Sequence, residues 1–465
     1  MSAPVLWIFL PLVLAGFLML LHNRKAITLI ACLSALFLTL AAWLLQIDTA
    51  MTIGSWSFKI TSSIDILGRS LVLSSADRSL LALIYGSVIV WFVTANAVKT
   101  SRRLIPLGLI ITALLVAALS VEPFLYAALI IETAVLISIP MLSAPRQKPG
   151  PGLLRFLIFQ TLAMPFVLFS GWLLAGIEAN PGDIGLVQQA AILIGLGFSF
   201  LLAVFPFYTW IPMLTEESSP FTVGFILWIF PTVTLFFGLG FLDHYTWLRD
   251  APLLGRVLMT VGILMVVSGG LLSAFQQQLE RILGYTVIME TGFSILSISL
   301  GGKTGLSFFF MLFIPRILSL VVWVLALTIL KEHSPTLTLS KMKGLGRDWP
   351  FATSGLVLAN LAFAGMPILA GFPPHLAVWE GLAFVSIPAV IWVLIGNFGL
   401  FFCAIRVLLT LFKTPEGTKW ESRETSVQRI FLTIGFIAIL ILGFFPQLVM
   451  PLWTNLPTIF THLGQ

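Results

Sequence analysis

The chain has 465 residues, of which 58% are hydrophobic and only 9% charged, and its mean hydropathy is +1.05. This composition excludes an ordinary soluble domain and indicates a polytopic membrane protein. The net charge of +6 does not indicate nucleic-acid binding, because the basic residues fall in short loops between apolar runs. Cys32 and Cys403 lie far apart inside such runs, so we expect no disulfide and no metal site.

Apolar runs long enough to cross a bilayer, at roughly 20 residues each, recur along the whole chain. They begin near residues 5, 26, 80, 104, 124, 153, 186, 220, 253, 281, 305, 352, 376 and 428. The predicted fold is therefore all-α, with about 14 transmembrane helices. Between residues 48 and 79 the sequence instead alternates polar and apolar residues around a glycine, which predicts a β-hairpin lying on one membrane face.

The basic residues are distributed unequally between alternate loops. One set of loops, together with the span ends beside them, holds 17 lysines and arginines, and the other set holds only 6. Since cytoplasmic loops carry the excess of positive charge, the first set is expected in the cytoplasm and both termini on the outer side of the cell (inner) membrane.

Two of the expected spans are interrupted by proline, which removes a backbone donor and breaks a helix. These are the seventh span, in LLAVFPFYTWIPMLTEESSP, and the twelfth, in LAFAGMPILAGFPPHLAVWEG. Broken helices five spans apart are typical of inverted-repeat transporters. The predicted organisation is an N-terminal unit of three helices and the possible hairpin over 1–103, repeats over 104–242 and 253–412, and a last helix within 413–465.

Few ionisable side chains lie inside the expected spans, where a charge costs at least about 2.5 kcal/mol and usually serves a function. Glu132 and Glu290 fall at matching positions of the two repeats, and His375 follows the second break. Each carboxylate is either part of a proton path or a protonated group that hydrogen-bonds a neighbouring helix. His375 either relays protons or caps the kink, and Arg316, which keeps its charge, is expected to be a counter-ion or a group that satisfies backbone carbonyls.

The remaining intramembrane charges and the known motifs add little. Glu380 and Arg406 lie near span ends, where long side chains reach the interface. The chain contains no Walker loop, dinucleotide fingerprint, cysteine cluster or His-Glu metal motif. We therefore expect no cofactor and no redox chemistry in this chain.

Several motifs together resemble the antiporter-like membrane subunits of respiratory complex I, a family shared with Mrp cation antiporters and membrane-bound hydrogenases. The similar segments are LYAALIIETAVLISIPM, PFYTWIP followed by ESSP, AFQQQLERILGYTVIMETGFSIL and AGMPILAGFPPH, which occur in the family's order. The resemblance implies fourteen helices with two inverted five-helix repeats, and it implies translocation of protons or sodium coupled to redox chemistry in partner subunits. The chain is closer in length to the family's M/N-type subunits than to its larger L-type subunit.

The resemblance also exposes departures from the family's pattern. The carboxylate of the fifth span is retained as Glu132, while the lysines of the seventh and eighth spans fall at Leu201 and Val233. The loop lysine falls at Glu280, and histidines of the family fall at Tyr208 and Glu290. His375 stands where the family has lysine or glutamate, and Arg316 stands near a position that is lysine in some members.

Three functions therefore stay open from the sequence. The first is a translocating subunit of a complex I-like, hydrogenase-like or Mrp-like assembly, with a path through Glu132, Glu290, Arg316 and His375. The second is a non-pumping subunit that braces such an assembly. The third is a stand-alone cation antiporter or solute transporter. The expected partners are the other membrane and hydrophilic subunits and the bilayer, without nucleic acid.

Overall fold

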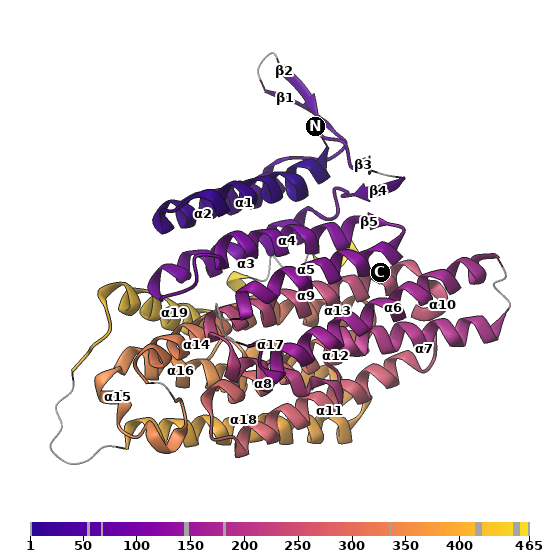
Figure 1. The fold of residues 1–465 in the computed structure, drawn as a ribbon. Coiled ribbons are helices and arrows are strands. Elements are labelled where there is room, and N and C mark those ends of the chain that lie inside the picture. The colour runs from indigo at the N-terminus through magenta and orange to yellow at the C-terminus, as the bar shows by residue number, and fades with distance from the viewer. Residues whose placement is uncertain are drawn as a thin grey trace.

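The computed structural model describes residues 2–53, 56–66, 68–143, 148–179, 183–334, 336–413, 421–449 and 456–463. Its α-helices pack side by side in one bundle (Figure 1). In chain order they are α1 Leu10–Leu20, α2 Arg24–Leu44, α3 Arg78–Thr94, α4 Leu104–Ser120, α5 Ala127–Leu142, α6 Pro151–Ala179, α7 Ile184–Leu201, α8 Trp210–Glu217, α9 Pro220–His244, α10 Thr246–Arg249, α11 Leu254–Phe275, α12 Leu279–Ser299, α13 Gly302–Met311, α14 Phe313–His333, α15 Leu345–Asp348, α16 Pro350–Phe363, α17 Phe372–Val385, α18 Ile387–Phe412 and α19 Ser426–Phe444.

By length and composition, eleven helical stretches of the described residues can cross a membrane, and three shorter apolar helices accompany them. The all-α membrane fold predicted from the sequence is thus confirmed, while the number of crossings stays a prediction. The most deeply buried stretches, at 83% of their most apolar window, are α9 and α12. The centre of the molecule is therefore built around these two helices.

Several of these helices begin at capping side chains or at prolines, which favour the start of a helix. The side chains of Asn23 and Asp183 accept backbone N–H groups at the starts of α2 and α7. Thr425 and Gln428 form a reciprocal capping box at the start of α19. Proline occupies the first turn of α9, α16 and α18, where its missing N–H is not needed.

Two short antiparallel hairpins follow α2, where the sequence predicted one. They pair β1 Ala50–Ile53 with β2 Trp56–Lys59, and β3 Ser63–Ile66 with β4 Arg69–Val72. The turn after β3 includes Gly68, whose φ of 73° suits glycine. The added hairpin pairs Ala50 with Lys59 and Ile53 with Trp56, and β5 Val121–Glu122 pairs with the other side of β4.

Both chain termini lie at the end of the bundle that carries these strands. Ala3 donates its backbone N–H to Thr61 beside the hairpins. Near the other terminus, Asp243 at the end of α9 accepts hydrogen bonds from Thr461 and from the next two backbone N–H groups. The adjacent His244 ring packs edge-on against Phe124, two residues after β5. Figure 1 shows the strands at this end and α15 at the opposite end.

Both predicted helix breaks are present. The first separates α7 from α8 over residues 202–209, and the second separates α16 from α17 over residues 364–371. Left-handed backbone occurs in both, at Ala203 in the first and at Gly365 and Ile368 in the second. The apolar run expected from residue 376 to 412 is divided at Ser386, whose hydroxyl accepts a backbone N–H of α18. Consequently α17 is the second part of the broken helix.

We call the elements from α4 to α9 the first half of the molecule and those from α11 to α18 the second half. In the second half, helices pack closely where glycines face one another. Gly270 of α11 faces Gly396 of α18, and a Cβ on either would collide with the opposing backbone. Small residues of this kind let helix backbones approach one another in membranes. The same helix α18 carries Cys403, which is buried, while Cys32 is half-buried, and both are free thiols.

Candidate functional sites at the two helix breaks

Glu132 lies beside the first helix break. It projects from α5, and its Oε1 accepts a 2.7 Å hydrogen bond from the Thr161 hydroxyl of α6. Its other oxygen, Oε2, is buried without a hydrogen-bond partner. The side chain borders a cavity of about 10 Å³, close to the roughly 10–15 Å³ that one water requires. The carboxylate therefore has one neutral donor, and no lysine, arginine or histidine lines its cavity.

Leu201, where the family places a lysine, borders the same cavity as Glu132. It is the last residue of α7 before the break and is buried. Its backbone carbonyl accepts a 3.3 Å hydrogen bond from Gln160, which also lines the cavity. The position inferred from the sequence motif is thus beside the carboxylate, and an isobutyl group stands where an ammonium is expected.

Glu290 and His375 form the second site, at the second helix break. Glu290 comes from α12 and His375 from the first turn of α17, and they are 3% and 1% exposed. The Nε2 atom of His375 lies 3.2 Å from Oε1 of Glu290. The imidazole stacks on Phe293 with ring centroids 4.1 Å apart, and its Nδ1 has no partner. Two groups that can exchange protons therefore share one hydrogen bond in an apolar setting.

Arg316 completes the second site from α14. It is 5% exposed, and its guanidinium donates 3.3 Å hydrogen bonds to Ser294 and Thr291 of α12. It interacts with the charge of Glu290 and borders the same cavity of about 10 Å³. Because arginine keeps its proton, the cluster has one fixed positive charge, and Glu290 and His375 are its two exchangeable positions.

Helix α9 separates the two sites and carries no charge along its spanning length. Its sequence from Pro220 to Leu242 contains no Lys, Arg, His, Asp or Glu. Val233, the second expected lysine position, is fully buried on this helix. The neighbouring Thr232 borders a small cavity with Arg316, while Phe237 borders the cavity of Glu132. Among the described residues, no hydrogen bond links the Glu132 site to the Arg316 site.

The other departures from the family's pattern lie near the end of the bundle away from the strands, where two ion pairs and a ring contact form. Glu280, at the loop lysine position, pairs with Lys331 at 3.3 Å. The adjacent Arg281 pairs with Glu216 of α8 at 2.7 Å. Tyr208 is buried, and its ring meets Tyr285 at 6.4 Å. These contacts tie α8 to α12 and α14.

Sequence reasoning missed the polar groups that hold the charged residues. Gln160 and Thr161 stand in the apolar run of α6, and Thr291 and Ser294 follow Glu290 by one and four residues. Their polarity inside an apolar run was a visible signal. Because each hydroxyl can also bond a carbonyl of its own helix, the sequence could not reveal which ones bond the carboxylate or the guanidinium.

Comparison with known protein families gives a match over part of the chain. Residues 176–403, which include both breaks and most of the second half, match the sequence family described as NADH:quinone oxidoreductase/Mrp antiporter, TM. This segment of the chain is similar to that antiporter-like family. The match begins within α6 and ends within α18, so it covers Glu290, Arg316 and His375 but not Glu132.

Similar proteins extend the likeness beyond that segment. NADH-quinone oxidoreductase subunit N of Nitrosomonas europaea is 26% identical over 327 residues, covering 64% of this chain and 65% of the relative. A chain of the Mrp complex from Dietzia sp. superimposes with a TM-score of 0.83 at 16% identity, covering 99% of this chain and 97% of that one. A chain of respiratory complex I from Thermus thermophilus gives 0.77 at 19% identity, covering 99% and 100%. These two structural likenesses establish the fold.

Proposed function

We propose that the chain is a proton-translocating membrane subunit of a complex I-type or related assembly. The observation that carries this proposal is the buried cluster of Glu290, His375 and Arg316 at the second helix break. A buried charge is costly unless it is paired, and here the pairing leaves His375 and Glu290 able to hold or release a proton. The relatives contribute the setting, since they are subunits of oxidoreductase and Mrp complexes.

A proton suits the cluster better than sodium. The fixed charge of Arg316 opposes a metal cation at the same place, and the site offers one carboxylate. Among the residues that the structure describes, no group of three or more His, Cys, Asp or Glu side chains can hold a metal ion. Hydrogen-bonded Glu and His side chains need only a change of protonation to carry a charge.

Within this proposal, the second half is the active one. Glu132 has no cation partner at Leu201, and α9 offers no charge to couple the two sites. The first half then serves to seal and brace the membrane region. The fully non-pumping alternative is favoured by the ion pairs that tie α8, α12 and α14 together, because they give the chain a bracing role without any transport.

The test is to measure the proton-to-electron ratio of the intact assembly in vesicles after single substitutions. Glu290→Gln and His375→Phe are expected to lower the ratio by this subunit's share, and Glu132→Gln is expected to leave it unchanged. Glu280→Gln is the matched control, because Glu280 is a buried carboxylate of the same helix that pairs with Lys331 instead. Equal ratios for Glu290→Gln and Glu280→Gln would favour the non-pumping brace.

The proposed orientation puts the strands and both termini on the outer face of the membrane. Its support is the excess of lysine and arginine at the opposite end of the bundle; two members of that basic set, Arg146 and Lys419, lie outside the described residues. Labelling with an impermeant thiol reagent tests it in intact cells. Asp65→Cys, on the exposed hairpin, should react, and Ser101→Cys, in an exposed loop at the other end, should not. The reverse pattern would invert the orientation.

A further inference from the structure

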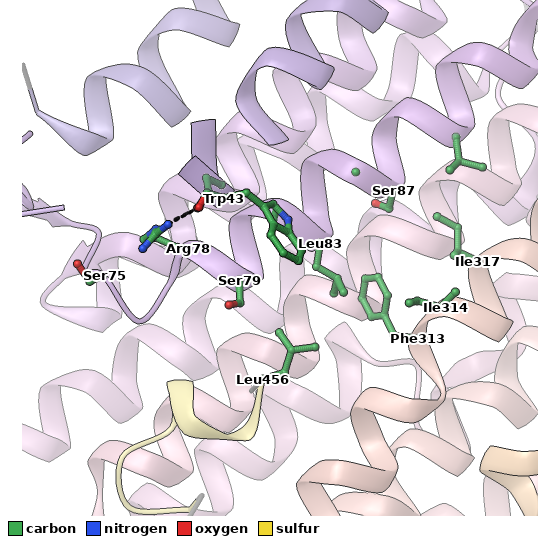
Figure 2. Close-up of a pocket in the computed structure, with 14 residues that line it drawn as sticks. Trp43, Ser75, Arg78, Ser79, Leu83, Ser87, Phe313, Ile314, Ile317 and Leu456 are labelled. Atoms are coloured by element: carbon green, nitrogen blue, oxygen red, sulfur yellow. Dashed lines mark hydrogen bonds between the residues drawn. The ribbon is translucent and has the colours of Figure 1, made fainter. Parts of the chain in front are cut away.

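A cavity of about 420 Å³ lies away from both helix breaks, between α3 and α14. Figure 2 shows Arg78 and Ser75 at one end and Ser87, Ile317 and Ile314 toward the other. The lining residues are Ala42, Trp43, Ser75, Arg78, Ser79, Ala82, Leu83, Gly86, Ser87, Val90, Phe313, Ile314, Ile317 and Leu456. We call this cavity the α3–α14 groove. It is polar at the Arg78 end and mainly apolar beyond it.

The position of the polar end matches the level of lipid headgroups. Arg78 is the first residue of α3, and its Nε and Nη2 donate to the carbonyls of Ala42 and Trp43 at the end of α2. Its Nη1 makes no hydrogen bond to the described residues, and the exposed hydroxyl of Ser79 lies one residue further on. Trp43, with 58% of its surface exposed, stands beside them as an interfacial tryptophan does. A guanidinium with a remaining donor is a good partner for a phosphate.

The length of the groove matches one leaflet. Its lining residues on α3 recur at 78, 79, 82, 83, 86, 87 and 90, which places them along one face of the helix. From Arg78 to Val90 the helix advances twelve residues, a rise of about 18 Å at 1.5 Å per residue. Half of the hydrocarbon core of a bilayer is about 15 Å. The groove therefore offers room for an acyl chain below a phosphate held at Arg78.

From this geometry we propose that the α3–α14 groove binds a phospholipid, with its phosphate at Arg78 and an acyl chain along α3. The acyl chain packs against Phe313, Ile314 and Ile317 of α14, and Phe313 also borders the cavity of Arg316, which donates to Ser294 of α12. At the inner end, Ser87 accepts a 3.2 Å hydrogen bond from the indole of Trp228, which borders the Arg316 cavity. The lipid supports α14 from behind and touches neither Glu290 nor His375. The proposal does not rest on proton translocation.

The experiment is native mass spectrometry of the full-length protein after reconstitution in phosphatidylcholine vesicles and extraction in mild detergent. The vesicles contain a minor share of either phosphatidylglycerol or the diacylglycerol with the same chains. We expect one retained phospholipid per chain and no retained diacylglycerol. A retained diacylglycerol, or a retained molecule without a phosphate such as a quinone, would overturn the proposal.

Two pairs of variants locate the lipid. Arg78→Gln should lower retention about tenfold, because a charge-assisted hydrogen bond to the phosphate is lost, while Arg102→Gln, at the other end of the bundle, should not. Gly86→Leu should abolish retention by filling the groove, and its added Cβ meets only Thr39 at 3.7 Å. Gly16→Leu is the control, since its Cβ has nothing within 4 Å.

Arg78 also holds the end of α2, so folding needs its own control. Arg78→Lys keeps the cation and is expected to retain phosphatidylglycerol, and circular dichroism checks the helix content of each variant. Equal lipid retention by Arg78→Gln and Arg102→Gln, with both folded, would show that the lipid does not bind through Arg78.

Discussion

Each half of the molecule places a carboxylate beside a broken helix, but the side chains around the two carboxylates differ. Glu132 has a threonine hydroxyl and a leucine beside it, whereas Glu290 has a histidine and an arginine. In the first half, α6 supplies the polar contacts: Thr161 donates to Glu132, and Gln160 donates to the carbonyl of Leu201. In the second half, α14 supplies Arg316, which donates to Ser294. The same architecture thus supports one site with a fixed countercharge and one without.

This difference teaches that conserving a fold and conserving a charge network are separate matters. A leucine at position 201 packs into the bundle without disturbing the break, because the break depends on the backbone around Ala203 and on the prolines that follow. The charge network depends on single side chains instead. Substitutions at those side chains should therefore separate stability from coupling in each half.

The largest expected effect is in the second half. Arg316→Met leaves Glu290 without its countercharge in a buried setting, which should lower the free energy of unfolding by about 3–5 kcal/mol. In the Glu290→Gln background the same substitution should cost much less. Denaturant unfolding in detergent, followed by tryptophan fluorescence, measures both. An identical cost in the two backgrounds would mean that the two charges are not coupled.

An intermediate effect is expected from rebuilding the missing pair in the first half. Leu201→Lys puts an ammonium beside the cavity where Oε2 of Glu132 lacks a partner. The lysine should be tolerated better with Glu132 than with Glu132→Gln, by a coupling of about 0.5–3 kcal/mol. A double-mutant cycle of unfolding free energies gives this number. A coupling of zero would place the two side chains out of contact.

The smallest effect is expected from removing the neutral donor of Glu132. Thr161→Val loses one hydrogen bond to the carboxylate and should lower the free energy of unfolding by about 1 kcal/mol. Thr133→Val, an exposed threonine that bonds only its own helix, is the matched control and should change it by less than about 0.5 kcal/mol. If both variants behave alike, the bond between Thr161 and Glu132 contributes nothing to stability.

Much of the fold could be predicted because apolar runs and prolines act locally. The breaks around Ala203 and Ile368 follow from the prolines and glycines in the two segments, and the alternating segment did form strands. The added strand pair over 50–59 was not expected, since its first strand follows a helix without a clear turn signal. The apolar runs gave no separate start for α18, because α17 and α18 form one continuous apolar run that divides at a single serine cap.

The candidate site was predicted less completely, because contacts between helices depend on packing. Glu290 and His375 are 85 residues apart, and only the fold shows that they share a hydrogen bond. The expected link from Glu132 to this pair stays a prediction, and the uncharged α9 argues for two separate sites. The role expected for Arg316 stays a prediction, and its hydrogen-bond partners Ser294 and Thr291 were not identified from the sequence.

The glycine contact between α11 and α18 has a consequence for motion. Where Gly270 and Gly396 bring two backbones together, no side chain fits between α11 and α18, so we expect these two closely packed helices to move as one unit. The break between α16 and α17 has left-handed residues and no continuous helical hydrogen bonds, so it is the softer element. A working cycle would then consist of small displacements of the turn that carries His375, over a stationary frame, in place of rocking whole helices.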